Sequence, residues 1–411
     1  MNIKEQSLFI YRIRNLKLFK RLKNVTTMLP PPGKYTDRLT HTNDVLRIGK
    51  QIDRMCVSKM KMKHIRNLGP ACIIHDIGHC CFAHEAEVVL NDFIASKLCI
   101  PKEKVCFSHA VNGALVLAIA SRNTKCPTDF SNANYFRNSK YDMDMKIIID
   151  SMIKHSFKDE FVNSVYFRFV ESQYNYETGK TLLRKTRNNK NPIYETGYYV
   201  RVADDIASKN SDVMDLMSHY YKTSISRKNR KGLFYIISDG YITQIYKEIK
   251  KTKNQIFNIE KIFTSLPTYI AQKNMLNVSY NFSYKRELTK EAQTLISDVA
   301  EAIFNRPSIL RMCGQSHRHA YIAEIFEAYS KKLGFNKFND FNAFELAKKY
   351  LLNIYNIQNN YKKAFCQYVC AIAFEISNFT DKGIVDFARK INKNRKLSTK
   401  IRIGKLLNTN Y

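Results

Sequence analysis

Residues 75–87 read HDIGHCCFAHEAE and bring together groups that bind metal ions and carry protons. Three of the chain's 10 histidines lie here, together with two cysteines and three acidic residues. Neutral imidazoles and carboxylates are ligands of catalytic divalent ions, provided that the site keeps one position open for water. His75 and Asp76 are adjacent, and adjacent side chains on a helix point about 100° apart. An ion that they share must therefore lie near a helix end, where other helices complete its ligands.

Two other segments offer the missing ligands. His41 begins a predicted helix in DRLTHTNDV, and VADDIA supplies a carboxylate from either Asp204 or Asp205. Cys80 and Cys81 would suit a zinc ion, but the histidines and acids suffice, so we interpret both cysteines as small packing residues. These ligands alone predict metal-assisted hydrolysis of a phosphoester.

The elements that must position these groups are predicted to be helices. The alternation in 232–242 favours a short hairpin, whereas helical spacing of apolar residues dominates elsewhere. A break near residue 216 divides the chain into 1–217, which carries most histidines, and 218–411, predicted to be mostly helical with a basic tail. We therefore predict a mainly α fold. The helical spacing is found in six segments: 41–55, 109–122, 143–157, 198–217, 290–304 and 361–377.

The charge balance narrows the class of partner. The chain has 67 basic and 36 acidic residues, a net charge of +31, which attracts nucleotides, nucleic acids or anionic surfaces. An AT-rich genome also produces an excess of lysine. The net charge alone therefore does not distinguish a functional positive surface from a compositional bias. Three basic runs are candidate contacts for single-stranded nucleic acid: 184–190, 227–231 and 390–405. The alternative is that they are solvated surface and, for the last run, a frayed end.

Cysteine usage and hydropathy predict the compartment. The 10 cysteines form no spaced framework, and the adjacent Cys80 and Cys81 are typical of reduced thiols in an intracellular protein. The first residues show no continuous apolar run of the kind that a secretory signal needs. No apolar stretch approaches the roughly 18 residues of a membrane span. The sequence therefore predicts a soluble, cytoplasmic protein without membrane contact.

Five segments, in order, resemble one branch of the HD-domain metal-dependent phosphohydrolases, the deoxyguanosine triphosphate triphosphohydrolases. HDIGHCCFAHEAE is similar to the branch's HDIGHPPFGHAGE, and ADDIASKNSDVMD is similar to ADDIAYTTHDLED. This resemblance implies an HD-domain helical core in 1–217 with an additional C-terminal helical lobe. The other three matches lie at 19–50, 107–117 and 376–391.

The resemblance implies one divalent ion per site, Mg²⁺ or Mn²⁺, with other transition metals as alternatives. The implied metal ligands are His41, His75, Asp76 and Asp204. Asp204 is preferred to Asp205 because Asp204, Ser208 and Asp212 share one helical face. The family uses that face for the metal and then for the deoxyribose, so Ser208 and Asp212 are predicted to meet the substrate.

Further roles follow from the same resemblance. His84, Glu87 and His109 match a proton-relay cluster, and Arg38 matches an arginine that grips phosphate. Lys154 and His155 match weakly, and a solvated pair explains them equally well. Three more residues are predicted near the substrate: Arg21, Thr27 and His79.

The implied reaction is hydrolysis of a dNTP, with dGTP as the expected substrate. Water attacks the α-phosphorus and releases deoxynucleoside and tripolyphosphate, and the family commonly forms homo-oligomers. Thr27 stands where the family has Gln, and Ser208 stands where it has Tyr. Both changes fall in the implied sugar pocket, so ribonucleotides could also be accepted. Two alternatives stay open, an HD-type phosphohydrolase of another nucleotide or nucleic-acid phosphoester, and a single-stranded nucleic-acid-binding protein on the same scaffold.

Overall fold

The computed structural model of the chain describes 1–27, 37–60, 63–122, 142–156, 164–174, 177–189, 191–220, 240–244, 247, 282–305 and 359–394. These residues form helices and no strand, apart from one isolated bridge between Thr26 and Asp37. The predicted mainly α fold is therefore confirmed. Among the described helices, none is long and apolar enough to cross a membrane.

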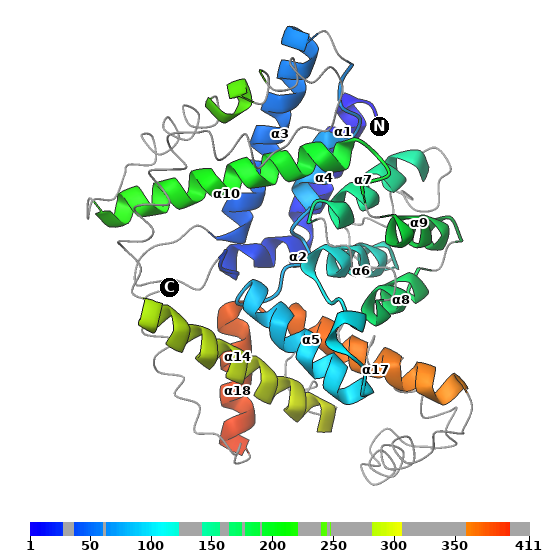
Figure 1. Cartoon of the computed structure of the whole chain (residues 1–411), viewed down its shortest axis with the longest axis vertical. Helices are drawn as coiled ribbons and strands as arrows, with labels where there is room; N and C mark the ends of the chain where they lie inside the picture. Colours follow the sequence, from blue (N-terminus) through cyan, green and yellow to red (C-terminus); the bar gives the residue numbers. More distant parts are fainter. Residues whose placement is uncertain are drawn as a thin grey trace.

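One group of helices forms the body around the histidine-rich segment. α10 crosses α3 and packs on α4 and α7, and α1 and α6 contact α4 and α7 respectively (Figure 1). The bounds of the elements in this first part of the chain are α1 (Ile3–Asn15), α2 (Lys17–Lys20), η1 (Arg21–Asn24), α3 (Arg38–Met60), α4 (Leu68–Ile74), α6 (His109–Arg122), α7 (Asp142–Lys154), α8 (Val165–Ser172), α9 (Glu177–Asn188) and α10 (Thr196–Tyr220).

A second group of helices packs around α5, at the lower end of the view in Figure 1. α14 and α17 both contact α5, and α14 also contacts α17 and α18. Lys97 on α5 pairs with Glu301 on α14 at 2.7 Å. Helices from the C-terminal half are thereby held against the histidine-rich segment. The bounds are α5 (His84–Leu98), η2 (Lys102–Lys104), α14 (Phe282–Asn305), α17 (Asn359–Ser377) and α18 (Asp381–Asn394).

The predicted helical segments are helical in the structure, except that the helix in 143–157 ends at Lys154. The segment at 109–122 coincides with α6, whose apolar side chains are buried nearly all round, as its continuous hydrophobicity predicts. The predicted hairpin is not confirmed, because 240–244 is helical and the rest of that segment lies outside the described residues. The division after residue 217 stays a prediction, and α10 continues through it to Tyr220.

A close approach of two backbones fixes the turn that follows α4. A Cβ atom at Gly78 would collide with the carbonyl oxygen of His109 and the nitrogen of Gly113, so only glycine fits there. The amide of Asn112 donates to Gly78 O at 2.7 Å and holds the same contact. The HD segment is thus packed directly against the start of α6, which brings His109 beside it.

Candidate metal centre

Three of the four predicted metal ligands, His41, His75 and Asp204, place their ligand atoms within 4.8 Å of one another, and Asp76 lies beside them. His41 lies in the first turn of α3, Asp204 lies in α10, and His75 and Asp76 directly follow the end of α4. His41 Nε2 is 2.9 Å from Asp204 Oδ1, and His75 Nε2 is 3.5 Å from the same oxygen. Asp76 lies 3.3 Å from His75 Nε2 through Oδ1 and 3.6 Å from His41 Nε2 through Oδ2.

These separations fit ligands of one ion. Two atoms that each lie about 2.0–2.2 Å from a metal are about 2.9–3.5 Å apart at ordinary coordination angles. His75 Nδ1 donates to Cys72 O at 2.8 Å, so Nε2 is the ring nitrogen that faces the carboxylates. That buried Nε2 has no hydrogen-bond partner among the described residues. The arrangement could therefore hold a divalent ion.

The electrostatics of this point favour a cation. Burial lowers the pKa of His75, but the carboxylates of Asp76 and Asp204 outweigh it and raise that pKa to about 9. Burial raises the pKa of Asp204, and contacts with His41 and His75 hold it well below its usual value. Two carboxylates that stay ionised in a buried site attract positive charge, whether it is a proton on His75 or a metal ion.

The alternative carboxylate points elsewhere. Asp205 is the next residue on α10, but its side chain is 38% exposed and faces Arg201 Nε at 3.8 Å. Ser208 lies one turn after Asp204 on the same face and is half-buried. The side chain of Asp212 lies outside the described residues. The geometry therefore favours Asp204 over Asp205 as the fourth ligand.

Arg38 lies beside the ligands at the start of α3. Its Nη1 atom is 2.8 Å from Asp76 Oδ2, and its Nη2 atom donates to Thr27 O at 3.0 Å. The guanidinium is buried and keeps its charge at any working pH. A permanent positive charge is thus held next to the four ligands, while Thr27 contributes its backbone carbonyl to the arrangement.

The predicted proton-relay residues are also brought together. Glu87 Oε1 is 2.6 Å from His109 Nδ1 and accepts from the His109 backbone N–H at 3.1 Å. His84 Nδ1 is 3.5 Å from the same Glu87 oxygen, with its side chain 62% exposed. Burial raises the pKa of Glu87, but His109 and His84 together hold it well below its usual value. An ionised carboxylate thus links a solvent-facing histidine to a buried one.

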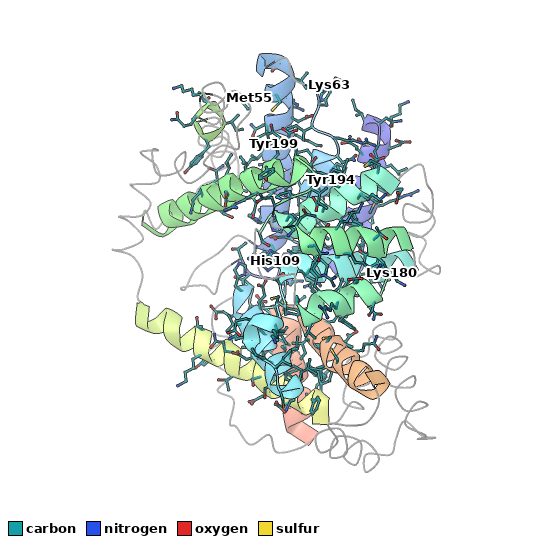
Figure 2. All side chains as sticks on the ribbon, turned by 45° about the vertical axis from the view of Figure 1, so that its right-hand side comes forward. Met55, Lys63, His109, Lys180, Tyr194 and Tyr199 are labelled. Carbon is teal, nitrogen blue, oxygen red and sulfur yellow. The ribbon has the colours of Figure 1, made fainter. Side chains whose placement is uncertain are left out.

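His79 connects this cluster to the metal ligands. Its ring stacks on His109 with centroids 3.9 Å apart, and its Nε2 atom is 3.3 Å from Asp76 Oδ1. Burial, together with Arg38 and His109, lowers the pKa of His79 well below its usual value, so the ring is neutral. His109 itself lies at the junction between the two groups of helices (Figure 2).

His155, which has no definite role in the sequence analysis, lies beside His75 and His109. Its side chain is 3% exposed, and its Nε2 atom is 3.3 Å from His109 Nε2. Burial and the neighbouring His75 and His109 lower the pKa of His155 to about 4. The interpretation of Lys154 and His155 as a solvated pair is wrong, because both are buried and Lys154 donates to Asn189 O. Helical spacing was the available signal, since His155 follows the buried Met152 by three positions.

Arg21 braces the loop that carries the site. Its Nη2 atom donates to Ile77 O at 3.2 Å and to His79 O at 2.6 Å. A buried guanidinium on backbone carbonyls fixes the turn between Asp76 and the start of α5. The predicted contact of Arg21 with the nucleotide stays a prediction.

Asp381 is a second residue without an assigned role in the sequence reasoning. It begins α18, is buried, and accepts from Phe82 N at 2.7 Å through Oδ1 and from Thr26 N at 3.0 Å through Oδ2. Phe82 and Ala83 have positive φ angles of 53° and 52°, a conformation that costs free energy unless neighbours hold it. Burial raises the pKa of Asp381 to about 6. One carboxylate therefore ties three distant segments around the loop before His84.

Asp381→Asn keeps the size of the side chain but should weaken its hydrogen bonds with Thr26 N and Phe82 N. Both carboxylate oxygens accept from backbone N–H groups, whereas an amide offers one acceptor and turns an N–H donor toward the other N–H. We expect the free energy of unfolding to fall by about 1–3 kcal/mol, measured by urea denaturation. Asp386→Asn, an exposed change on the same helix, is the control. Equal stability of both variants would contradict this role.

The described fold and its buried histidine and aspartate cluster define a helical protein that could hold a metal ion.

The chain is 34% identical over 116 residues to a deoxyguanosinetriphosphate triphosphohydrolase-like protein of Clostridium tetani. The matched region covers 28% of this chain and 29% of that protein. It is 29% identical to the deoxyguanosinetriphosphate triphosphohydrolases of Salmonella arizonae and Enterobacter sp., over 21% of this chain and 20% of each relative. The chain thus spans less than a third of the length of these curated relatives. No family model matches the chain. The similarity supports a partial relationship to the deoxyguanosinetriphosphate triphosphohydrolases.

Proposed function

We propose that this chain is a divalent-metal-dependent triphosphohydrolase of dNTPs, with dGTP as the first candidate substrate. The observation that supports the proposal is the grouping of His41, His75 and Asp204, whose ligand atoms lie within 4.8 Å of one another, with Asp76 3.3 Å from His75 Nε2. The partial similarity to deoxyguanosinetriphosphate triphosphohydrolases supports the substrate class. A bound ion would supply a water of lowered pKa and a Lewis acid for attack on the α-phosphorus. The products are deoxynucleoside and tripolyphosphate.

The side chains around the ligands supply the remaining chemistry. Arg38 offers positive charge to the triphosphate oxygens from a fixed position beside Asp76. His84 is the exposed member of the proton-relay cluster and donates a proton to the leaving oxygen, with Glu87 holding its ring. His109 orients Glu87 through its Nδ1 atom. His79 packs between this cluster and Asp76 and keeps water out.

Arg38→Lys should lower kcat/KM by about 10- to 100-fold, or about 1.4–2.7 kcal/mol of transition-state stabilisation. A guanidinium can hold Asp76 and Thr27 O with two nitrogens and still face phosphate, whereas one ammonium cannot. Steady-state kinetics on the best dNTP measures the effect. Arg47→Lys, on the same helix and paired with Asp44 near the surface, is the matched control. Equal kinetics of both variants would show that Arg38 does not serve the substrate.

A panel of the four dNTPs and four NTPs tests the substrate class directly. Each nucleotide is incubated with the protein and Mn²⁺ or Mg²⁺, and nucleoside and tripolyphosphate are separated by ion-exchange chromatography. The proposal expects equal amounts of deoxynucleoside and tripolyphosphate. The small Ser208 and Thr27 side chains leave room at the expected sugar position, so ribonucleotide turnover would fit the same site. Release of monophosphate and pyrophosphate would instead favour a different HD-type phosphohydrolase.

Binding of single-stranded nucleic acid has no specific support among the described residues. In the run 184–190, Arg184 and Arg187 both pair with Glu171, at 2.6 Å and 2.9 Å. The run 227–231 and most of 390–405 lie outside the described residues. This partner, the homo-oligomer and the cytoplasmic location stay predictions.

A further inference from the structure

The turn that follows the His-Asp pair presents three successive backbone carbonyls, and each accepts a hydrogen bond from a side chain of another element. Arg21 Nη2, in η1, donates to Ile77 O at 3.2 Å and to His79 O at 2.6 Å. The carbonyl between them, Gly78 O, accepts from Asn112 Nδ2 of α6 at 2.7 Å. The orientation of the turn is therefore set from two different elements.

Asn112 uses both ends of its amide in this region, where its side chain is fully buried. A carbonyl oxygen only accepts, so the amide nitrogen is the atom that must face Gly78 O. The same nitrogen donates to Ser377 Oγ at 3.0 Å, and Asn112 Oδ1 accepts from the Tyr166 hydroxyl at 2.7 Å. The Ser377 hydroxyl donates in turn to Phe374 O at 2.6 Å. One amide thereby joins the turn to α6, α8 and α17.

The turn and α6 meet among the groups of the candidate metal centre. Asp76 begins the turn, and its Oδ1 atom is 3.3 Å from both His75 Nε2 and His79 Nε2. His109 lies one helical turn before Asn112 on α6, and its Nε2 atom is 3.9 Å from Asp76 Oδ1. A shift of the turn relative to α6 would change these separations. Because metal sites tolerate an error of only about 0.2 Å in ligand distance, such a shift should weaken binding of a cation.

We propose that Asn112 is a positioning residue for the metal centre. Through Gly78 O it holds the turn in the place that brings Asp76 to the other ligands and His79 to Asp76. It acts through the backbone of the turn, and partners of this kind commonly change metal affinity or activity by about 10- to 100-fold. This role rests on the proposed function, because the cation and its ligands are the ones assigned there.

Asn112→Leu tests the role, because leucine keeps the approximate size of the side chain, adds no charge and removes both N–H donors. We expect the dissociation constant for Mn²⁺ to rise about 10- to 100-fold, measured from the electron paramagnetic resonance signal of free Mn²⁺ during a titration. We also expect kcat on dGTP at saturating Mn²⁺ to fall, with KM nearly unchanged. Wild-type Mn²⁺ affinity in Asn112→Leu would overturn the proposal.

The double variant Tyr166→Phe/Ser377→Ala is the matched control. It removes two partners of the Asn112 amide and keeps the hydrogen bond to Gly78 O. A purely structural role of Asn112 predicts lower stability in both proteins and the same Mn²⁺ affinity in both. The positioning role predicts that the double variant loses thermal stability but binds Mn²⁺ like wild type. Equal weakening of Mn²⁺ binding in the control and in Asn112→Leu would overturn the proposal.

A triple variant covers an Asn112→Leu protein that does not fold. Asn112→Leu added to the double variant leaves neither hydroxyl facing the leucine, and replacing both sides of a buried hydrogen bond by apolar groups costs little. The triple and double variants then differ only by the amide and its bond to Gly78 O. Equal Mn²⁺ affinity of these two proteins, or loss of folding in the triple variant as well, would overturn the positioning role.

The positioning role and the proposed function fail separately, because Mn²⁺ affinity is measured without turnover. If wild type hydrolyses dGTP and Asn112→Leu matches it in Mn²⁺ affinity and kcat, the positioning role is wrong and the function stands. If Asn112→Leu binds Mn²⁺ weakly and wild type binds it tightly but hydrolyses no nucleotide, the function is wrong and the positioning role stands.

Discussion

Asp204→Asn is expected to abolish retention of the metal in the four-ligand site and to lower kcat by about 10³-fold, whereas the neighbouring Asp205→Asn leaves both close to wild type. Asp204 Oδ1 lies 2.9 Å from His41 Nε2 and 3.5 Å from His75 Nε2, and its charge would balance a bound ion. An amide keeps the size but removes the charge. The Asp205 side chain is 38% exposed and faces Arg201 Nε at 3.8 Å.

Two measurements check this pair of variants. The first is kcat on the best dNTP at saturating Mn²⁺. The second is the thermal midpoint with and without Mn²⁺, because an ion at 100 times its dissociation constant stabilises the folded state by about 2.7 kcal/mol. Wild type and Asp205→Asn should gain stability from Mn²⁺, and Asp204→Asn should gain much less. Reversed behaviour of Asp204 and Asp205 would mean that α10 presents the other carboxylate to the site.

Glu87→Gln has the second largest expected effect, a fall in kcat of about 10²–10³-fold with little change in KM. Glu87 Oε1 accepts both hydrogen bonds from His109, and an amide oxygen can accept them equally. The fold should therefore survive while the negative charge that faces His84 Nδ1 at 3.5 Å is lost. The change isolates proton handling from packing.

Glu85→Gln is the matched control for this prediction. Glu85 lies two positions earlier on α5 and bonds Gln293 at 2.7 Å instead of a histidine. Stopped-flow or steady-state kinetics of both variants, with circular dichroism to confirm folding, separates the two roles. If Glu87→Gln retains wild-type kcat, or if Glu85→Gln loses as much, the proton-relay assignment is wrong.

Helical periodicity and continuous apolar runs predicted the fold well because the helices bury either one face or nearly their whole circumference. α6 is apolar nearly all round and is buried nearly all round, and the predicted segment at 143–157 corresponds to α7. The hairpin at 232–242 was wrong where it can be checked, because 240–244 is helical. A short apolar run fits a strand and a helix equally, and periodicity alone does not separate them.

The candidate site was predicted in part because motif residues carry recognisable chemistry. His75 and Asp76 stand out by type and spacing, so their meeting with His41 and Asp204 could be expected from the resemblance. His155 carried no motif, and its burial depends on the course of the chain just after α7 ends at Lys154.

The role of Asp381 could not be predicted from the sequence for a different physical reason. It serves the site through backbone N–H groups of Thr26 and Phe82, and any sequence provides such donors. Arg21 acts in the same way on the carbonyls of Ile77 and His79. Contacts to the backbone leave no pattern in the side chains that receive them.

The most direct test of the central claim is hydrolysis of dGTP in water enriched in heavy oxygen, with Mn²⁺ present. If water attacks the α-phosphorus at this site, mass spectrometry will find one heavy oxygen atom in tripolyphosphate and none in the deoxyguanosine. The label should be lost, together with turnover, in Asp204→Asn. Heavy oxygen in a nucleoside monophosphate, or full turnover by Asp204→Asn, would contradict the account.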